Sequence, residues 1–464
     1  MIRHRGNRYR GKHARNTDTH PRGPLHTADE FLGNCCLSKY AYGYQRSRRN
    51  QPLSLLNELK NLRISDIRGI AQLATQASVG VIRIAEGVHQ AVWKTMGAPG
   101  SKTPGQTRGV TGLVYKGVHL ATQLGGKGTE TVLARLQPLF ESAEASKRDT
   151  PGREAILAIL NGVIGDRLLA GNNVFATPMT LRYGDEALNW QTLPSTPAAP
   201  GKLLLLIHGL CTNDLQRHAL HKGHAPDHGE ALASALGYTP VYLRYNSGLH
   251  ISHNGRELSS QLEQLVTKWP TPVEELSVVA HSMGGLLIRS AHFYAKQETL
   301  RWPDHLKNIV FLGTPHHGAP LERAGNWMAM FLSSTPYTIP FATLGRLRSA
   351  GITDLRYGHV LDQDWQSHDR FHPGTDNRQP VSLPEGVACY TVAATRAARR
   401  GVLADRLVGD GLVPLHSALG HHDDTTRKLA FMNTSQWIAY RMKHMELLSS
   451  PRVTRQMVQW LTPG

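Results

Sequence analysis

Short apolar runs alternate with longer amphipathic segments from about residue 200 onward. The runs predicted as strands are KLLLLIHG, YTPVYLRYN, ELSVVAHS, LKNIVFLGTP and GVACYTVAAT, and the segments predicted as helices are HGEALASAL, GRELSSQLEQLVTKW and GGLLIRSAHFYAKQ. Apolar strands separated by helices are typical of a parallel sheet that is covered on both faces. An earlier segment, MTLRYGDEALNWQT, alternates around Gly184 and predicts a hairpin. The fold class is therefore α/β, with a mostly parallel, doubly wound sheet in a domain that spans residues 178–464.

Residues 53–177 are helical in character. Apolar residues recur there at steps of three or four, which places them on one face of a helix. They are Ile67, Ile70, Ala74, Ala77, Val81, Ile84, Val88 and Val92. Further apolar helices are predicted at about 112–124, 129–140 and 153–169. Such a region must bury its apolar faces, either against the sheet domain or on an anionic membrane. We expect docking on the domain first, with peripheral membrane contact as an addition.

The net charge of +17 is not evenly spread along the chain, since residues 1–52 are rich in arginine and lysine and poor in aliphatic residues. This composition predicts a disordered basic arm. The arm is either an anchor for an anionic surface or a solvated extension, and no specific nucleic-acid partner is expected. No apolar run reaches the eighteen residues of a membrane span, the N-terminus has no apolar signal segment, and four cysteines give no disulfide framework. These features predict a cytoplasmic protein, with a membrane-peripheral location as the alternative.

The segment VVAHSMGG places Ser282 between an apolar strand and a helix. Ala280 and Gly284 flank it at the two positions that must be small in a nucleophile elbow, where the chain turns sharply and exposes the serine. Alanine stands where glycine is usual, although it still removes most of the side-chain bulk. The pattern predicts Ser282 as a nucleophile at the carboxyl end of a central strand.

A serine nucleophile needs a histidine base and an orienting acid, which follow it in the order acid, then histidine, in this type of fold. Asp410 stands in the glycine-flanked turn GDG, and His444 precedes the last predicted helix. We predict Ser282, Asp410 and His444 as the catalytic residues. The alternatives in the same part of the chain are Asp405, Asp423 and Asp424 for the acid, and His416, His421 and His422 for the base.

The strand LLLLIHG ends in His208-Gly209, where the chain can turn tightly. The backbone N–H groups of Leu210 and of Met283, which follows the nucleophile, are predicted to hold the oxyanion. His208, Gly209 and His281 are further candidates for lining the site. Several histidines follow in the next loop, but none has the close spacing of a metal site, so no metal is predicted.

Five segments together, LIHGL, AHSMGG, FLGTPHHG, DGLVP and HMELL, resemble the bacterial lipases and esterases of the α/β-hydrolase superfamily. The resemblance covers residues 178–464 and implies an eight-stranded, mostly parallel sheet, a serine acyl-enzyme mechanism and no cofactor. The segment GTPHHG resembles the family's GTPHxG strand end, which implies that His316 and His317 line the site.

Residues 319–385 include an apolar insertion with Trp327, Phe331 and Phe341, which predicts a lid or, alternatively, a packing layer. We therefore expect a serine esterase or lipase that hydrolyses carboxylic esters with apolar acyl groups. A thioesterase or acyltransferase with the same triad is the enzymatic alternative, and a non-catalytic lipid-binding protein is the alternative from another class.

Overall fold

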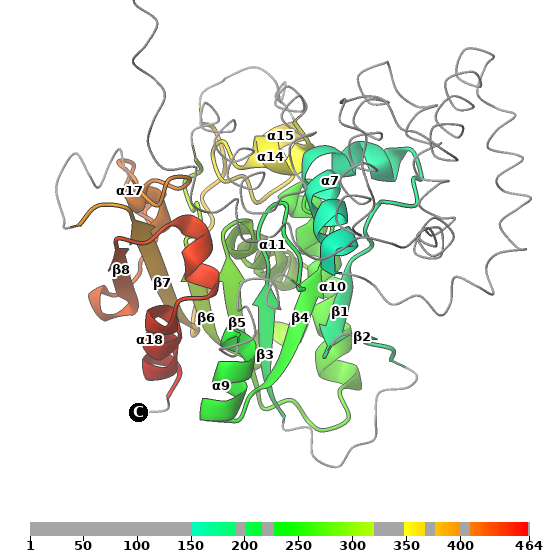
Figure 1. Ribbon diagram of the computed structural model, residues 1–464, viewed down its shortest axis with the longest axis horizontal. Coiled ribbons are helices and arrows are strands. Elements are labelled where there is room, and N and C mark those ends of the chain that lie inside the picture. The colour runs from blue at the N-terminus through cyan, green and yellow to red at the C-terminus, as the bar shows by residue number, and fades with distance from the viewer. Residues whose placement is uncertain are drawn as a thin grey trace, which may run out of the picture. The chain divides into compact units, whose positions relative to one another are not determined.

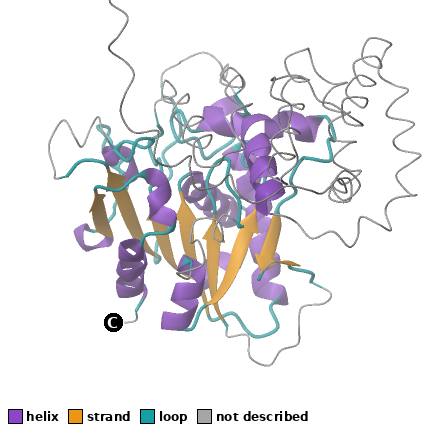
Figure 2. Cartoon of the chain, viewed as in Figure 1, coloured by secondary structure: helices purple, strands orange, loops and turns teal. Residues whose placement is uncertain are grey.

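An eight-stranded sheet forms the centre of the computed structural model (Figures 1 and 2). The structure describes residues 151–184, 186–190, 201–215, 227–319, 348–366, 376–398 and 409–462. The strand order is β2-β1-β4-β3-β5-β6-β7-β8. β1 runs antiparallel to both of its neighbours, and all the other neighbouring strands are parallel. The predicted α/β class with a mostly parallel sheet is confirmed.

All five strands predicted from apolar runs are present, and so is the hairpin. The strands are β1 (Thr180–Tyr183), β2 (Glu186–Ala187), β3 (Lys202–Ile207), β4 (Thr239–Arg244), β5 (Glu275–His281), β6 (Leu306–Leu312), β7 (Ala388–Thr395) and β8 (Gln436–Tyr440). Gly184 turns the β1–β2 hairpin with a φ of 62°. The apolar pattern did not single out β8, because only one of its five residues is buried at this edge of the sheet.

Helices cover both faces of the sheet (Figure 1). α10 (Ile251–Lys268) and α11 (Met283–Gln297) share one hydrophobic cluster with β3, β5 and β6. α9 (His228–Leu236) and α18 (Pro451–Leu461) share a second cluster with side chains from the opposite face. Because strand side chains alternate between the two faces, a strand covered on both sides must be apolar at successive positions. The run of leucines in β3 satisfies this requirement.

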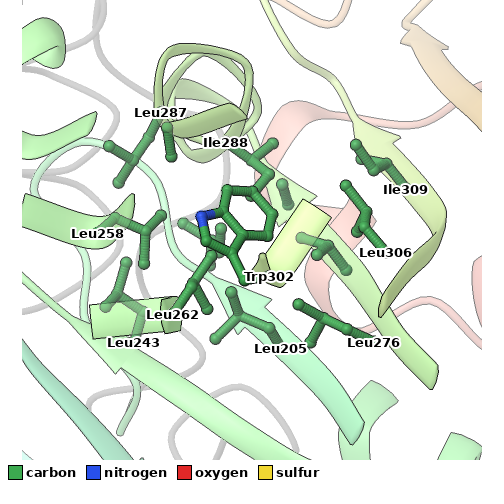
Figure 3. Packing of buried hydrophobic residues seen from close by; sticks show 14 of the residues in the cluster. Leu205, Leu243, Leu258, Leu262, Leu276, Leu287, Ile288, Trp302, Leu306 and Ile309 are labelled. Atoms are coloured by element: carbon green, nitrogen blue, oxygen red, sulfur yellow. The ribbon is translucent and has the colours of Figure 1, made fainter. Parts of the chain in front are cut away.

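Trp302 lies at the centre of the cluster beneath α10 and α11 (Figure 3). It begins the short helix α12 (Trp302–His305), is fully buried, and donates its indole N–H to Ser259 Oγ at 3.2 Å. Burial of each large apolar side chain of this kind stabilises the fold by about 1.5–3 kcal/mol. The side chains labelled around it in Figure 3 are Leu205, Leu243, Leu258, Leu262, Leu276, Leu287, Ile288, Leu306 and Ile309.

Shorter elements lie in the connections. They are α14 (Ala350–Asp354), α15 (Gln363–Gln366), α17 (Leu415–Ala418) and the 3-10 helices η4 (Asn433–Ser435) and η5 (His444–Leu448). α14 and α15 fall within the insertion predicted as a lid. The rest of the apolar part of that insertion, including Trp327, Phe331 and Phe341, lies outside the described residues.

Helix α7 (Pro151–Ala170) confirms the last helix predicted in the N-terminal region. Its buried side chains, among them Leu160, Val163 and Leu168, join a third cluster with Leu286 of α11. α7 is therefore packed into the sheet domain. The predictions for residues 1–150, including the basic arm and the other helices, lie outside the described residues. Within the described part of the chain, no helix is both long enough and apolar enough to cross a bilayer.

Candidate active site

Ser282 occupies the sharp turn between β5 and α11. Its φ of 55° and ψ of −123° are uncommon for a residue with a side chain and indicate a strained backbone held by its surroundings. Two bonds hold the turn: the Ser282 N–H donates to Leu312 O at 2.8 Å, and the Gly285 N–H donates to Ser282 O at 3.0 Å. The predicted strand–serine–helix geometry is therefore present.

Two glycines allow neighbouring segments to approach this turn. A Cβ atom on Gly284 would lie 2.7 Å from His208 O, and a Cβ atom on Gly209 would lie 2.9 Å from Ser282 Cβ. Real Cβ atoms do not come so close to other atoms, so neither position accepts a side chain without a shift of the backbone. The glycines thus bring the loop after β3 directly against the serine.

His444 and Asp410 form a buried pair. His444 Nδ1 lies 2.6 Å from Asp410 Oδ2, and the two side chains are 0% and 1% exposed. The other carboxylate oxygen, Oδ1, accepts the N–H groups of Leu412 and Val413 at 2.9 and 2.8 Å. These bonds fix the carboxylate in the turn that Gly409 and Gly411 make with φ values of 45° and 103°. Of the described acids and histidines considered from the sequence, the structure joins the predicted two, and Asp405 lies outside the described residues.

The His444 ring lies against the backbone that holds Ser282. A Cβ atom on Gly313 would lie 3.1 Å from His444 Cε1, and the residue before it, Leu312, accepts the Ser282 N–H. The ring of His281, which precedes the serine, has its centroid 4.7 Å from that of His444. The Ser282 hydroxyl is buried and makes no hydrogen bond within the described part of the chain. The His444–Asp410 pair therefore lies beside the backbone of Ser282, and the structure shows no serine–histidine hydrogen bond.

The loop after β3 carries the predicted oxyanion donor Leu210. Cys211, the next residue, donates its N–H to Ser247 Oγ at 3.1 Å, which anchors the loop. Met283 is the first residue of α11, so its N–H has no partner within the helix. Gly209 packs on Ser282. The two predicted donors therefore lie near the serine on different segments, Leu210 in the loop after β3 and Met283 at the start of α11.

Three of the histidines proposed to line the site are buried, and burial keeps them neutral. Burial lowers the pKa of His208 to about 4, and its ring stacks on Tyr245 with centroids 4.3 Å apart. Burial, followed by the neighbouring His444, lowers the pKa of His281 well below its usual value. His316 is 1% exposed and packs against the rings of Phe311 and Phe431.

The fourth, His317, is half-buried, and its Nδ1 lies 2.9 Å from Arg378 Nη2. Burial, followed by the charge of Arg378, lowers the pKa of His317 to about 3. All four rings therefore stay uncharged near neutral pH.

A cavity of about 80 Å³ borders His281 on the α9 side of the sheet. His208, Asp214 and Leu312 contribute to its wall, and Asp227 and His228 at the start of α9 close another side. His281 Nδ1 makes no hydrogen bond within the described residues. A small polar molecule in this cavity can therefore reach the residue next to the serine.

Sequence reasoning missed the polar network behind the loop after β3. Asp214 forms ion pairs with Arg182 at 3.0 Å and with Arg244 at 2.6 Å, and Arg244 also pairs with Glu154 of α7 at 3.0 Å. Asn213 of the same loop donates to Glu154 O at 2.9 Å. These residues come from four distant segments, and no spacing in the sequence links them. The network ties α7 to the loop that carries Leu210.

Comparisons with known proteins describe a distant likeness. A family model described as a domain of unknown function (DUF7379) matches residues 177–354, and no curated protein matches the chain. The chain is similar to the mature form of a Bacillus licheniformis lipase, with 16% identity and a TM-score of 0.36 over 61% of this chain and 98% of that one. It is also similar to Aspergillus fumigatus lipase B, with 10% identity and a TM-score of 0.39 over 87% of this chain and 86% of that one. A Pyrococcus furiosus esterase is 12% identical, with a TM-score of 0.31 over 56% of this chain and 81% of that one.

Proposed function

We propose that this protein is a serine hydrolase that cleaves carboxylic esters with apolar acyl groups. The observation that supports the proposal is a buried His444–Asp410 pair that lies beside the strained strand-to-helix turn of Ser282. Strain at a buried polar residue is commonly retained where it serves a function. The apolar cluster at this edge, which includes Leu210 and Met283, supports an apolar acyl group.

In the proposed mechanism His444 Nε2 takes the proton of Ser282 Oγ as the oxygen attacks the ester carbonyl carbon. The N–H groups of Leu210 and Met283 stabilise the oxyanion. His444 then donates the proton to the departing alcohol, which leaves an acyl group on Ser282. A water molecule attacks that ester with His444 again as the base, and the carboxylic acid leaves. Asp410 holds His444 in the required orientation throughout.

In this conformation the serine and histidine are not hydrogen bonded. Such bonds are often long before substrate binds and shorten in the reacting complex. We therefore expect the Ser282 side chain to rotate toward His444 Nε2 when the carbonyl group enters.

The experiment is labelling of the full chain with a fluorophosphonate, combined with turnover of p-nitrophenyl esters of increasing acyl length. The proposal predicts that Ser282→Ala loses both the label and the ester turnover. The reason is that loss of a triad member costs several powers of ten in kcat. Ser260→Ala, an exposed serine on α10, is the matched control and should behave as wild type. Unchanged turnover in folded Ser282→Ala would overturn the assignment.

A further inference from the structure

Buried polar nitrogens without hydrogen-bond partners gather between α11 and the loop after β6. They are Nε and Nη1 of Arg289 and both ring nitrogens of His316. Arg289 is 5% exposed and His316 is 1% exposed. Nearly all buried polar groups in folded proteins have partners, and each one left without a partner costs about 1–3 kcal/mol. Several such atoms on neighbouring residues point to something that they bind together.

The charged groups near these nitrogens leave Arg289 without a carboxylate in contact. Arg378 pairs with Asp376 at 3.3 Å and donates to His316 O at 3.1 Å. No carboxylate lies within ion-pair distance of Arg289 among the described residues, and its Nη2 donates only to the carbonyl of Val381 at 2.6 Å.

The charge of Asp364 acts on Arg289, where it opposes the lowering of the guanidinium pKa by burial, but the two groups form no ion pair. The Asp364 oxygens instead accept the N–H groups of Val360, Leu361 and Gln379 at 2.9–3.0 Å. A buried guanidinium without an anionic group in contact is costly, because the interior does not solvate it as water does.

Two arginine side chains lie near each other here. Burial and then the charge of Arg378 lower the pKa of Arg289 to about 9, against the opposing effect of Asp364. Burial, followed by the charge of Arg289 and then by the neighbouring His317 and Arg378, lowers the pKa of His316 well below its usual value. The neutral ring of His316 still carries one N–H, so it can donate a hydrogen bond beside the guanidinium.

We propose that Arg289 and His316 bind one small monovalent inorganic anion, of the size of chloride, beneath helix α11. The guanidinium supplies the charge and His316 supplies a second N–H donor. Because both side chains are almost fully enclosed, the ligand must be small enough to be surrounded by protein. A single negative charge in contact with the guanidinium would replace the solvation that burial removes, and the bound ion would join α11 to the loop after β6.

The test is the melting temperature of the full chain at pH 8 and constant ionic strength, with chloride replacing gluconate. The proposal predicts that Tm rises by about 2–4 °C once chloride exceeds its Kd tenfold, since a ligand that binds only the folded state stabilises it. Arg289→Met should remove this dependence. Arg301→Met, which replaces an arginine whose side chain is 74% exposed, should keep it.

A wild-type protein whose Tm is the same in chloride and gluconate would overturn the proposal, as would an equal chloride effect in Arg289→Met. If Arg289→Met does not fold, bromide-soaked crystals of the wild type decide the question. An anomalous peak within hydrogen-bond reach of Arg289 and His316 supports the site, and its absence there excludes it. None of these measurements depends on the activity of Ser282.

Discussion

Glu154 of helix α7 and Arg244 at the end of β4 form an ion pair of 3.0 Å, although 90 residues separate them in the chain. Both side chains are less than one-tenth exposed, and Arg244 also pairs with Asp214. Breaking a buried pair by removing one partner typically costs about 3–5 kcal/mol, since a charge is left buried without a partner. α7 is therefore a structural part of the proposed catalytic unit.

Two truncations test this role of α7. Removal of residues 1–150 should leave a folded protein with ester turnover, because every contact described above is kept. Removal of residues 1–170 should give an insoluble or inactive protein, since Leu160, Val163 and Leu168 would no longer cover the cluster beside α11. Solubility, circular dichroism and turnover are the measurements. A fully active, soluble 171–464 chain would show that α7 is dispensable.

Gly162→Ala tests whether α7 positions the loop that carries Leu210. A Cβ atom there would lie 2.3 Å from Cys211 Sγ and 2.9 Å from Cys211 N, so the loop must shift. We expect a loss of about 1–3 kcal/mol in stability. We also expect kcat to fall by about ten- to a hundredfold, with KM little changed, because oxyanion donors act mainly in the transition state.

The double variant Gly162→Ala, Cys211→Ala removes the closest clash and should recover part of the lost kcat. Arg167→Ala, an exposed position on the same helix, is the control and should be neutral. If Gly162→Ala destabilises the protein while kcat stays at the wild-type value, α7 contributes to folding alone.

Asp410→Asn should lower kcat by about 10³- to 10⁴-fold while the protein remains folded, as expected when the histidine loses the acid that orients it. The amide oxygen can still accept the N–H groups of Leu412 and Val413, so the turn should persist. Asp424→Asn replaces an exposed carboxylate in the same region and should leave turnover unchanged. Steady-state kinetics on one p-nitrophenyl ester distinguish the two acids. If Asp424→Asn lowered kcat and Asp410→Asn did not, Asp424 would be the acid that orients His444.

Stability should fall as the pH decreases from about 7 to 5. The folded-state pKa values of His208, His281 and His316 lie below the unfolded value of about 6.5, so the unfolded chain binds protons that the folded chain excludes. The contribution of these histidines to the stability of the fold is complete above pH 6.5. It is lost as the pH falls from 6.5 toward the folded-state pKa, which is about 4 for His208.

Each such histidine contributes up to about 1.4 kcal/mol per pH unit. Urea unfolding at pH 7 and pH 5 measures the total difference, and His208→Gln should reduce that difference by one histidine's share. Equal stability at the two pH values would mean that these rings are protonated in the folded protein.

The sheet and the catalytic candidates were predictable for a local reason. Strands β3 and β5 are buried on both faces, so their apolar runs are uninterrupted, and Ser282 lies in a pattern of small residues that the turn itself requires. Asp410 was identified by its flanking glycines, whose positive φ values the structure shows. Each of these features depends on neighbours in the sequence.

The remaining features depend on contacts between distant segments. The Glu154–Arg244–Asp214 network joins residues whose sequence neighbours give no sign of pairing, because a charged residue at a strand end is ordinarily solvated. β8 has one fully buried residue, so its apolar pattern is weak. The gathering of Arg289 and His316 likewise appears only when α11 packs on the loop after β6.

The placement of Asp410 and His444 has a consequence for how activity returns during refolding. Asp410 follows β7, and His444 follows β8, the outermost strand on that side of the sheet. Trp302, by contrast, is buried where Leu276 of β5 pairs with Leu306 of β6, 30 residues later, whereas Asn308 of β6 pairs with Ala388 of β7, 80 residues later. Pairings between distant segments carry a larger entropic cost and tend to form later. Recovery of esterase activity should thus lag behind the burial of Trp302, so that an intermediate with β5 and β6 already paired would be catalytically silent until β7 and β8 have docked.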